Sequence, residues 1–145
     1  MSAVIRIRDV RVGDAAELAQ LVGELGYPTE TPLMAARLSA LLGREQRRIR
    51  VAERGGAVCG WVEAGLRLTL DTDERVEILA LIVAEKVRQH GVGRLLVTDI
   101  EQWARALGMT SLVVRSNILR DASHPFYRQL GFEQRKTQHY YVKAL

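Results

Sequence analysis

Three residues near the middle of the chain have the types and spacing of an anion-binding loop, namely Arg88, Gly91 and Gly93. They follow an apolar, β-branched run from Ile78 to Val83 and precede a strongly periodic helical pattern. A strand, a glycine-bearing loop and a helix N-terminus in this order leave backbone N–H groups unpaired at one point, where the helix dipole also favours negative charge. The stretch from Glu77 to Leu96 therefore predicts a site for an anionic group.

Two better-known phosphate-binding loops do not fit this stretch. A Walker loop ends in Gly-Lys-Ser/Thr, whereas Gly93 is followed by Arg94 and Leu95. A dinucleotide-binding fingerprint needs Gly or Ala where the chain has Leu96, and it belongs to the start of a longer double βαβ unit. Taken alone, the two glycines also fit a turn that merely precedes a helix.

The surrounding sequence predicts the elements that position this loop. Alternating or apolar runs predict strands at 4–10, 49–53, 57–70, 78–83, 111–115, 132–136 and 138–143. Helices are expected to begin near Asp14, Thr31, Val92 and Ser123 and to end at Gly26, Gly43, Gly108 and Gly131. The strand–helix–strand order around the loop indicates a right-handed parallel crossover. We therefore expect one α/β (α+β) domain over residues 1–145, with a single mixed, mostly antiparallel sheet of about six to seven strands and helices on both faces.

Composition narrows the class of protein. The chain has 145 residues, 48% of them apolar, and a net charge of +4, which suits an anionic ligand. Its one cysteine, Cys59, lies in a strand-like context and is interpreted as a small buried residue. The N-terminus is not a signal peptide, and no stretch approaches the roughly 18 apolar residues of a membrane span, so a cytoplasmic protein is predicted.

Metal and nucleic-acid sites are not predicted. His90, His124 and His139 lack metal-ligand spacing. The densest basic stretch, Arg44 to Arg50, is interrupted by an acid and is interpreted as a solvated helix end and turn. An RNA-binding domain would interleave aromatic and basic residues on a sheet face, and only Tyr140-Tyr141 come close to that pattern.

A second block makes the loop more specific. It consists of Asn117, then His124-Pro125-Phe126-Tyr127, then Leu130-Gly131-Phe132, and one amphipathic helix and one strand separate it from the loop. Together with Arg88-x-x-Gly91-x-Gly93, this block resembles the GNAT-type N-acetyltransferase superfamily. The resemblance covers essentially the whole chain and departs from the family at Pro125, where a longer side chain is usual.

The resemblance implies a coenzyme A site. The central strand would offer backbone groups near Leu81, Ile82 and Val83 to the pantetheine arm, as an added strand would. The pyrophosphate would bind the backbone N–H groups of the loop, with charge-assisted contacts from its two arginines. The residues of this loop are Arg88, Gln89, His90, Gly91, Val92, Gly93 and Arg94. Asn117 matches a family position near the pantetheine, although an Asn after a strand is also a common turn residue.

The resemblance also implies two catalytic residues. Tyr127 matches a tyrosine that in many members protonates the leaving coenzyme thiolate, and its rival interpretation is a core tyrosine. Glu77 is the acid of the central strand and the candidate base for the amine, and its rival interpretation is an exposed charge at the start of a strand. The nearby acidic turn from Asp71 to Glu74 would attract a cationic acceptor or would simply be solvated.

The implied activity is transfer of an acetyl group from acetyl-CoA, without a metal, to a primary amine by direct attack. Backbone N–H groups near Val83 would stabilise the oxyanion. The acceptor stays open among a small amine, an aminoglycoside-like polyamine and a protein amino group, while nucleic acid and membrane are not expected as partners. The alternative is a non-catalytic acyl-CoA-binding sensor or partner domain. Dimerisation through the last strand is common in the family, and the sequence leaves it open.

Overall fold

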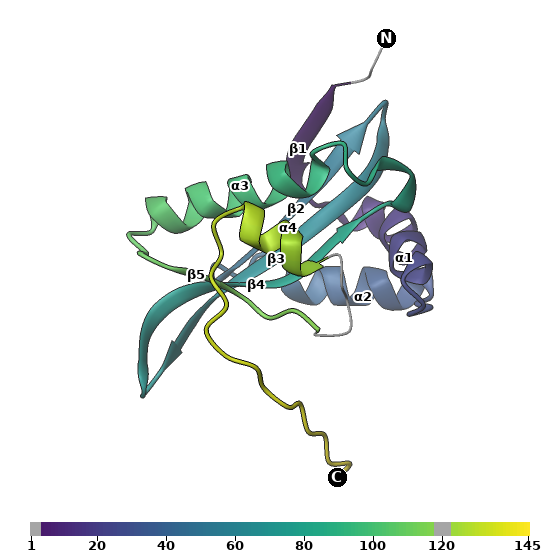
Figure 1. Cartoon of the computed structure of the whole chain (residues 1–145). Helices are drawn as coiled ribbons and strands as arrows, with labels where there is room; N and C mark the ends of the chain where they lie inside the picture. Colours follow the sequence, from purple (N-terminus) through teal and green to yellow (C-terminus); the bar gives the residue numbers. More distant parts are fainter. Residues whose placement is uncertain (1–3, 118–122) are drawn as a thin grey trace. The chain divides into compact units, whose positions relative to one another are not determined.

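A computed structural model describes residues 4–117 and 123–145, in two compact units that divide after Arg115. The first unit carries a five-stranded sheet in the order β1-β2-β3-β4-β5 (Figure 1). Its strands are β1 (Ile5–Asp9), β2 (Arg47–Arg54), β3 (Ala57–Thr69), β4 (Thr72–Val83) and β5 (Leu112–Val114). Its helical elements are η1 (Val12–Asp14), α1 (Ala15–Glu24), α2 (Thr31–Leu41), η2 (Glu85–Val87) and α3 (Val92–Ala106).

The sheet is mixed and mostly antiparallel, as predicted. Only β5 runs parallel to its neighbour β4, because the crossover through α3 separates the two strands in the chain. The tight hairpin between β2 and β3 turns at Gly55 and Gly56, whose φ angles of 60° and 82° are those of the predicted two-residue turn.

The central hairpin of β3 and β4 differs from the prediction. β4 begins at Thr72, so most of the expected acidic turn belongs to the strand. The β3–β4 register changes between the pairs Glu63↔Ala80 and Ala64↔Ile78, which leaves Leu79 as an extra residue on β4. Such a β-bulge bends a strand locally, and hydrophobic periodicity does not reveal it.

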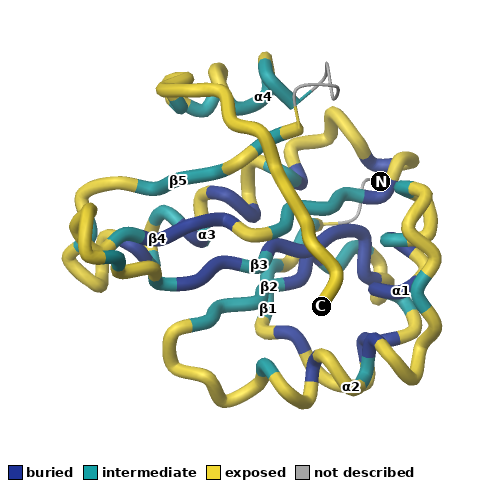
Figure 2. Tube along the Cα trace, turned by 90° about the horizontal axis from the view of Figure 1, so that it is seen from below, coloured by how far each residue is buried: buried dark blue, intermediate teal, exposed yellow. Residues whose placement is uncertain are grey.

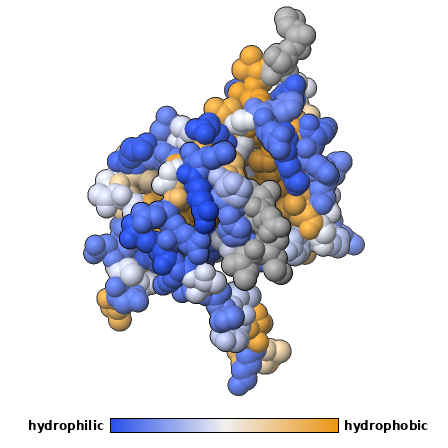
Figure 3. Space-filling model, in the orientation of Figure 1, coloured by the Kyte–Doolittle hydropathy of each residue, from blue (hydrophilic) through white to orange (hydrophobic). Residues whose placement is uncertain are grey.

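Helices cover both faces of the sheet. α3 packs against the face toward which Gly60 points, while α1 and α2 lie on the other face (Figure 1). The buried residues lie along β3, in the middle of β4 and on the inner turns of α1 and α3 (Figure 2). In the part of the chain that the structure describes, no helix is both long and apolar enough to cross a membrane. The far end of the β3–β4 hairpin carries exposed Leu68 and Leu70, and Figure 3 shows hydrophobic side chains there.

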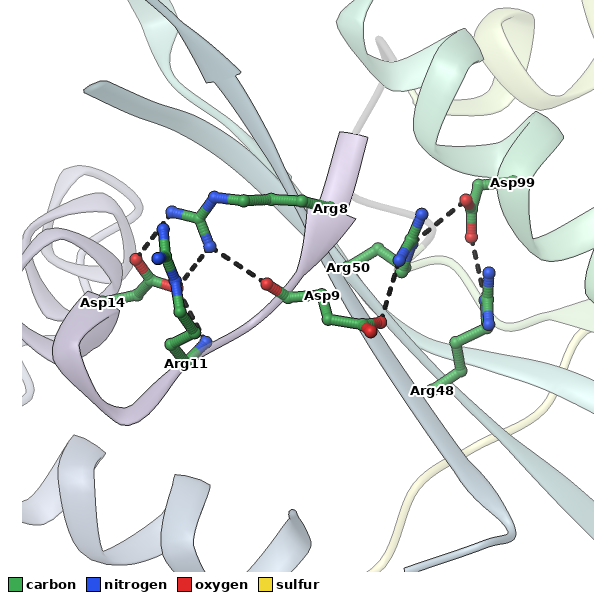
Figure 4. A network of polar contacts seen from close by, with 7 residues as sticks. All are labelled: Arg8, Asp9, Arg11, Asp14, Arg48, Arg50 and Asp99. Carbon is green, nitrogen blue, oxygen red and sulfur yellow. Dashed lines mark hydrogen bonds and ion pairs between the residues drawn. The ribbon is translucent and has the colours of Figure 1, made fainter. Parts of the chain in front are cut away.

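Ion pairs connect β1 to η1 and β2 to α3 (Figure 4). The Asp14 carboxylate accepts hydrogen bonds of 2.8 and 2.9 Å from the Arg8 guanidinium, which holds the pKa of this carboxyl below its usual value. On the other face, Asp99 of α3 accepts from Arg48 at 2.9 Å and from Arg50 at 3.1 Å. The first pair joins β1 to η1, which leads into α1, and the second joins β2 to α3.

The basic stretch from Arg44 to Arg50 was predicted as a solvated helix end and turn, and this is wrong for its second half. β2 begins at Arg47, and the arginines at 47, 48 and 50 all make ion pairs. The alternation of arginines with Ile49 and Val51 is that of a strand with one charged face, whose charges α3 partly neutralises.

The second unit contains α4 (Ser123–Gln129), close to the predicted helix. The two last predicted strands, 132–136 and 138–143, are not formed, and the residues from 132 onward have no regular secondary structure. Tyr140, Tyr141 and Val142 are 78–91% exposed. A strand exists only where a neighbouring strand accepts its hydrogen bonds, and an alternating sequence alone does not supply that neighbour.

Candidate functional site

The N-terminus of α3 has the geometry of an anion site. Gly91 is its N-cap residue with a φ of 83°, and no side chain among the described residues caps this end. The Leu95 N–H donates to the Gly91 carbonyl at 3.1 Å, which is the first turn of the helix. The N–H groups of Val92, Gly93 and Arg94 therefore have no acceptor within the helix. Glycine is needed at position 91 for the backbone conformation, since a Cβ there would meet no atom within 4 Å.

The loop before this helix is backbone-strained and tied to β4. Gln89 has a φ of 69° and is the one non-glycine residue with a positive φ in residues 4–117 and 123–145. This left-handed conformation is uncommon for a residue with a side chain, and such outliers concentrate at ligand sites. The Arg88 Nε donates to the Val83 carbonyl at 3.3 Å, so the loop folds back onto the end of β4.

The edge of β4 next to this loop is open. Val83, Ile82 and Leu81 pair with β3, opposite Gly60, Trp61 and Val62. The ladder with β5 covers only Val76 to Ile78, so no strand of the described first unit pairs with the other edge of residues 79–83. Hydrogen-bonding groups on this edge are available to an extended ligand.

Gly60 lets these elements approach one another closely. A Cβ at this position would lie 2.9 Å from the Ile82 carbonyl oxygen and 3.3 and 3.4 Å from side-chain atoms of Val92 and Leu96. The end of β4 and the first turns of α3 thus pack onto a glycine of β3. Any side chain here would move the open strand edge relative to the helix N-terminus.

Glu77 is buried on β4 and has two cationic partners. Its side chain is 7% exposed, and its Oε1 lies 3.2 Å from Arg67 Nη1 and 3.3 Å from Arg115 Nε. The rival interpretation of Glu77 as an exposed charge is therefore wrong. The role of Glu77 as a base stays a prediction.

The remaining predicted site residues belong to the second unit. Tyr127 lies on α4 and meets the rings of Phe126 and Phe132 edge-on, with centroids 5.1 and 5.5 Å away. Asn117 is exposed and precedes the residues that the structure does not describe. The first unit thus brings together the strand edge at 81–83, Arg88 and the α3 N-terminus, while the second unit holds Asn117 and Tyr127.

Other candidate sites lie elsewhere or are inert. A cavity of about 310 Å³ opens beside Leu42, Arg48 and Trp103. Trp103 comes eleven residues after Val92, about 16 Å along α3, so this cavity is separate from the helix N-terminus. Cys59 is buried, as predicted, and burial raises the pKa of its thiol. Within the described residues, no group of three or more His, Cys, Asp or Glu side chains is placed to hold a metal ion.

Sequence reasoning missed three features of this site: the bulge at Leu79, the strained Gln89 and the arginines around Glu77. The first two have no signal in residue type. The contact between Arg67 and Glu77 could be identified only once the register of the β3–β4 hairpin was known, because the two residues lie ten positions apart in the chain. Gly60 gave a usable signal, because an isolated glycine inside a strand pattern often marks a close backbone approach.

Comparisons with known proteins agree on the fold and the family. A family model described as "Acetyltransferase (GNAT) family" matches residues 15–132, across both units. N-acetyltransferase family 8 member 2 of Rattus norvegicus is 31% identical over 93 residues, which cover 63% of this chain and 40% of the relative. The chain therefore spans less than half the length of this curated relative. An IAA acetyltransferase of Azospirillum brasilense is 29% identical over 130 residues, which cover 89% of this chain and 80% of the relative.

Solved structures share the architecture. The aminoglycoside N-acetyltransferase AAC(6')-Iy, in a complex with CoA, superposes with a TM-score of 0.86 at 18% identity. The superposition covers 100% of this chain and 98% of that one. At 18% identity this similarity shows a shared fold, and the structure of that protein contains CoA.

Proposed function

Because the chain belongs to the acetyltransferase (GNAT) family, we propose that it transfers an acetyl group from acetyl-CoA to a primary amine by direct attack. One observation carries the proposal: an uncapped helix N-terminus follows directly after a strand whose outer edge is open. A helix N-terminus recognises a pyrophosphate, and an open strand edge recognises the amides of a pantetheine arm. Coenzyme A carries these two groups in succession.

The coenzyme is held mainly by backbone groups. Its pyrophosphate accepts hydrogen bonds from the N–H groups around Gly91 to Arg94, and the Arg88 and Arg94 side chains add charge-assisted contacts. Its pantetheine amides pair with the β4 edge at Leu81, Ile82 and Val83. Asn117 is a further proposed contact of the pantetheine.

The chemistry needs no covalent enzyme intermediate. The amine nitrogen attacks the thioester carbonyl carbon, and a backbone N–H on the open edge of β4 stabilises the oxyanion that forms. The attacking nitrogen gives up one proton to water, the C–S bond breaks, and the thiolate takes the phenolic proton of Tyr127, which solvent later replaces. Direct attack is supported by Cys59, whose buried thiol with a raised pKa is a poor nucleophile.

A thiol-release assay with acetyl-CoA and an amine panel tests this function. The wild-type protein should release CoA only when an acceptor is present. Tyr127→Phe keeps the ring contacts with Phe126 and Phe132 but removes the proton, so kcat should fall by about 10²-fold or more. The Kd for acetyl-CoA should stay unchanged, and Tyr141→Phe on an exposed tyrosine serves as the control.

One outcome would contradict the proposed activity, and another would contradict only the role of Tyr127. Binding of acetyl-CoA without acceptor-dependent thiol release from any amine would favour a non-catalytic acyl-CoA-binding module. Undiminished turnover in Tyr127→Phe would remove the assigned role of the phenol and leave the rest of the proposal standing.

We further propose that the protein forms a homodimer through its C-terminal segment. Residues 138–143 have the sequence of a strand, but they have no regular secondary structure and are exposed, with Tyr140 and Tyr141 about nine-tenths exposed. A second copy would supply the missing ladder partner and cover these rings. Sedimentation equilibrium of the full chain and of a Tyr140→Asp/Tyr141→Asp variant tests this, and a monomeric wild-type protein would contradict it.

A further inference from the structure

Arginine side chains gather on one face of the β3–β4 hairpin. Arg67 and Arg75 are directly opposite each other in the antiparallel ladder, and Arg67 and Arg115 share the carboxylate of Glu77. Arg75 donates to the Thr72 hydroxyl and to no carboxylate among the described residues. We call Arg67, Arg75, Arg115 and Glu77 the arginine cluster.

The pairing of Arg67 with Arg75 is unfavourable for the folded protein alone. Like charges directly opposite each other in an antiparallel pair are destabilising. Asp73 and Glu74, at the start of β4, make no ion pair with either arginine in the described structure. Arg67 is nearly half exposed, at 45%, so its guanidinium is accessible to a ligand. Glu77 offsets the charge of Arg67, and an anion between the two strands would offset that of Arg75.

The arginine cluster lies next to the proposed position of the acetyl group, and this step rests on the proposed function. A pantetheine arm that pairs with β4 from Val83 toward its beginning passes Leu79 after four residues, about 13 Å. At Leu79 the strand bulges, and β5 joins the ladder from Ile78 onward, so the open edge ends there. The reactive end of the arm would therefore stop within two residues of Glu77.

The side chains of Arg67 and Glu77 lie on the face of the sheet opposite α3. Gly60 faces α3, and side chains alternate along β3, so Arg67, seven residues later, points to the opposite face. Glu77 lies on the same face as Arg67, because the two make a hydrogen bond of 3.2 Å. An amine that approaches from the face not covered by α3 meets these side chains.

We infer that the acceptor is an amine that also carries a carboxylate, which Arg67 and Arg75 bind while the amine attacks the thioester. Guanidinium groups bind carboxylates with paired, charge-assisted hydrogen bonds. Glu77 then acts as a positioning residue that holds Arg67 and Arg115 in place. The same positive charges repel polycationic acceptors of the aminoglycoside type.

Matched pairs of acceptors test this inference on the full chain. Amino acids and short peptides are compared as free acids and as the corresponding amides, with a diamine of similar length as the cationic member. The free acids should have kcat/KM values at least about tenfold above those of their amides, and the diamine should be the poorest acceptor. In Arg75→Gln and Arg67→Gln this preference should shrink toward unity through a higher acceptor KM.

Control measurements separate this inference from the proposed function. The Kd for acetyl-CoA should be unchanged in both variants, and Arg105→Gln, on an exposed arginine of α3, should keep the preference. Arg75→Gln leaves the contacts of Glu77 intact, so it reports on recognition even if Arg67→Gln folds poorly. Equal or faster transfer to amides and diamines would overturn the inference and leave the acetyltransferase function standing. Acetyl-CoA binding without transfer to any acceptor would overturn both.

Discussion

Replacing Gly60 with alanine tests whether the proposed coenzyme site depends on close packing of β3, β4 and α3. The added Cβ would lie 2.9 Å from the Ile82 carbonyl oxygen, which is well inside the normal contact distance. The carbonyl cannot rotate away freely, because β4 is paired with β3 here and the Ala84 N–H donates to the Cys59 carbonyl at 2.8 Å. The strand itself would have to move.

The magnitude follows from the cost of overpacking a well-packed core, about 1–3 kcal/mol. For a chain of this size each kcal/mol lowers the Tm by about 2–4 °C, so Gly60→Ala should melt about 2–12 °C below wild type. The shift of Ile82 relative to Val92 also separates the strand edge from the helix N-terminus. Acetyl-CoA binding should weaken by about tenfold as a result.

Thermal unfolding and isothermal titration with acetyl-CoA measure the two effects. Gly23→Ala is the matched control, since a Cβ there meets nothing within 4 Å and the residue lies in α1, where alanine stabilises by about 0.5–1 kcal/mol. A Gly60→Ala protein with wild-type Tm and wild-type affinity for acetyl-CoA would refute the reasoning. A lower Tm with unchanged affinity would refute only its functional half.

Three further predictions concern the loop, the first unit's ion pairs and α3. Gly91→Ala forces a side chain into a φ of 83° and should cost about 1–2 kcal/mol in urea unfolding and weaken acetyl-CoA binding, whereas an unchanged Kd would contradict the assigned role of this N-cap. Arg8 lowers the folded-state pKa of Asp14, so the stability this pair contributes is present above the unfolded-state pKa of about 3.9 and is lost as the pH falls through the lower folded value. Asp14→Asn should therefore lower the free energy of unfolding at pH 7 by about 1–3 kcal/mol, and this free energy should fall less steeply in acid than in wild type. Urea unfolding at a series of pH values measures both effects, and an equal loss of stability in acid for the two proteins would rule this out. Asp99→Asn should weaken the contacts of Arg48 and Arg50 and lower the Tm without changing kcat, and a selective loss of activity would be the contrary result.

The sequence predicted those parts of the fold in which local signals agree with tertiary structure. The hairpin at Gly55-Gly56, the helix that follows Gly91 and the parallel strand near residue 112 are where turn chemistry and periodicity placed them. The last two strands were not predictable, because Tyr140 and Tyr141 show strand propensity but pairing depends on a neighbour that propensity does not specify.

The loop before α3 was predictable from the sequence, and the surroundings of Glu77 were not. Arg88, Gly91 and Gly93 lie within six residues, and together with the block from Asn117 to Phe132 their spacing predicted an anion site at this helix N-terminus. The environment of Glu77 depends on the β3–β4 register, on a bulge at Leu79 and on Arg115 from the parallel strand's end. These are long-range facts, and they show Glu77 as a buried carboxylate with two arginine partners and not as an exposed charge.

Backbone amide hydrogen exchange with and without acetyl-CoA tests the central claim most directly. If the coenzyme lies along the open edge of β4 and over the α3 N-terminus, exchange should slow at residues 79–83 and 89–94. The cavity beside Trp103, on the later part of α3, should show no change. Unaltered exchange at 79–83 and 89–94 in protein saturated with acetyl-CoA, or protection confined to the Trp103 cavity, would contradict the account.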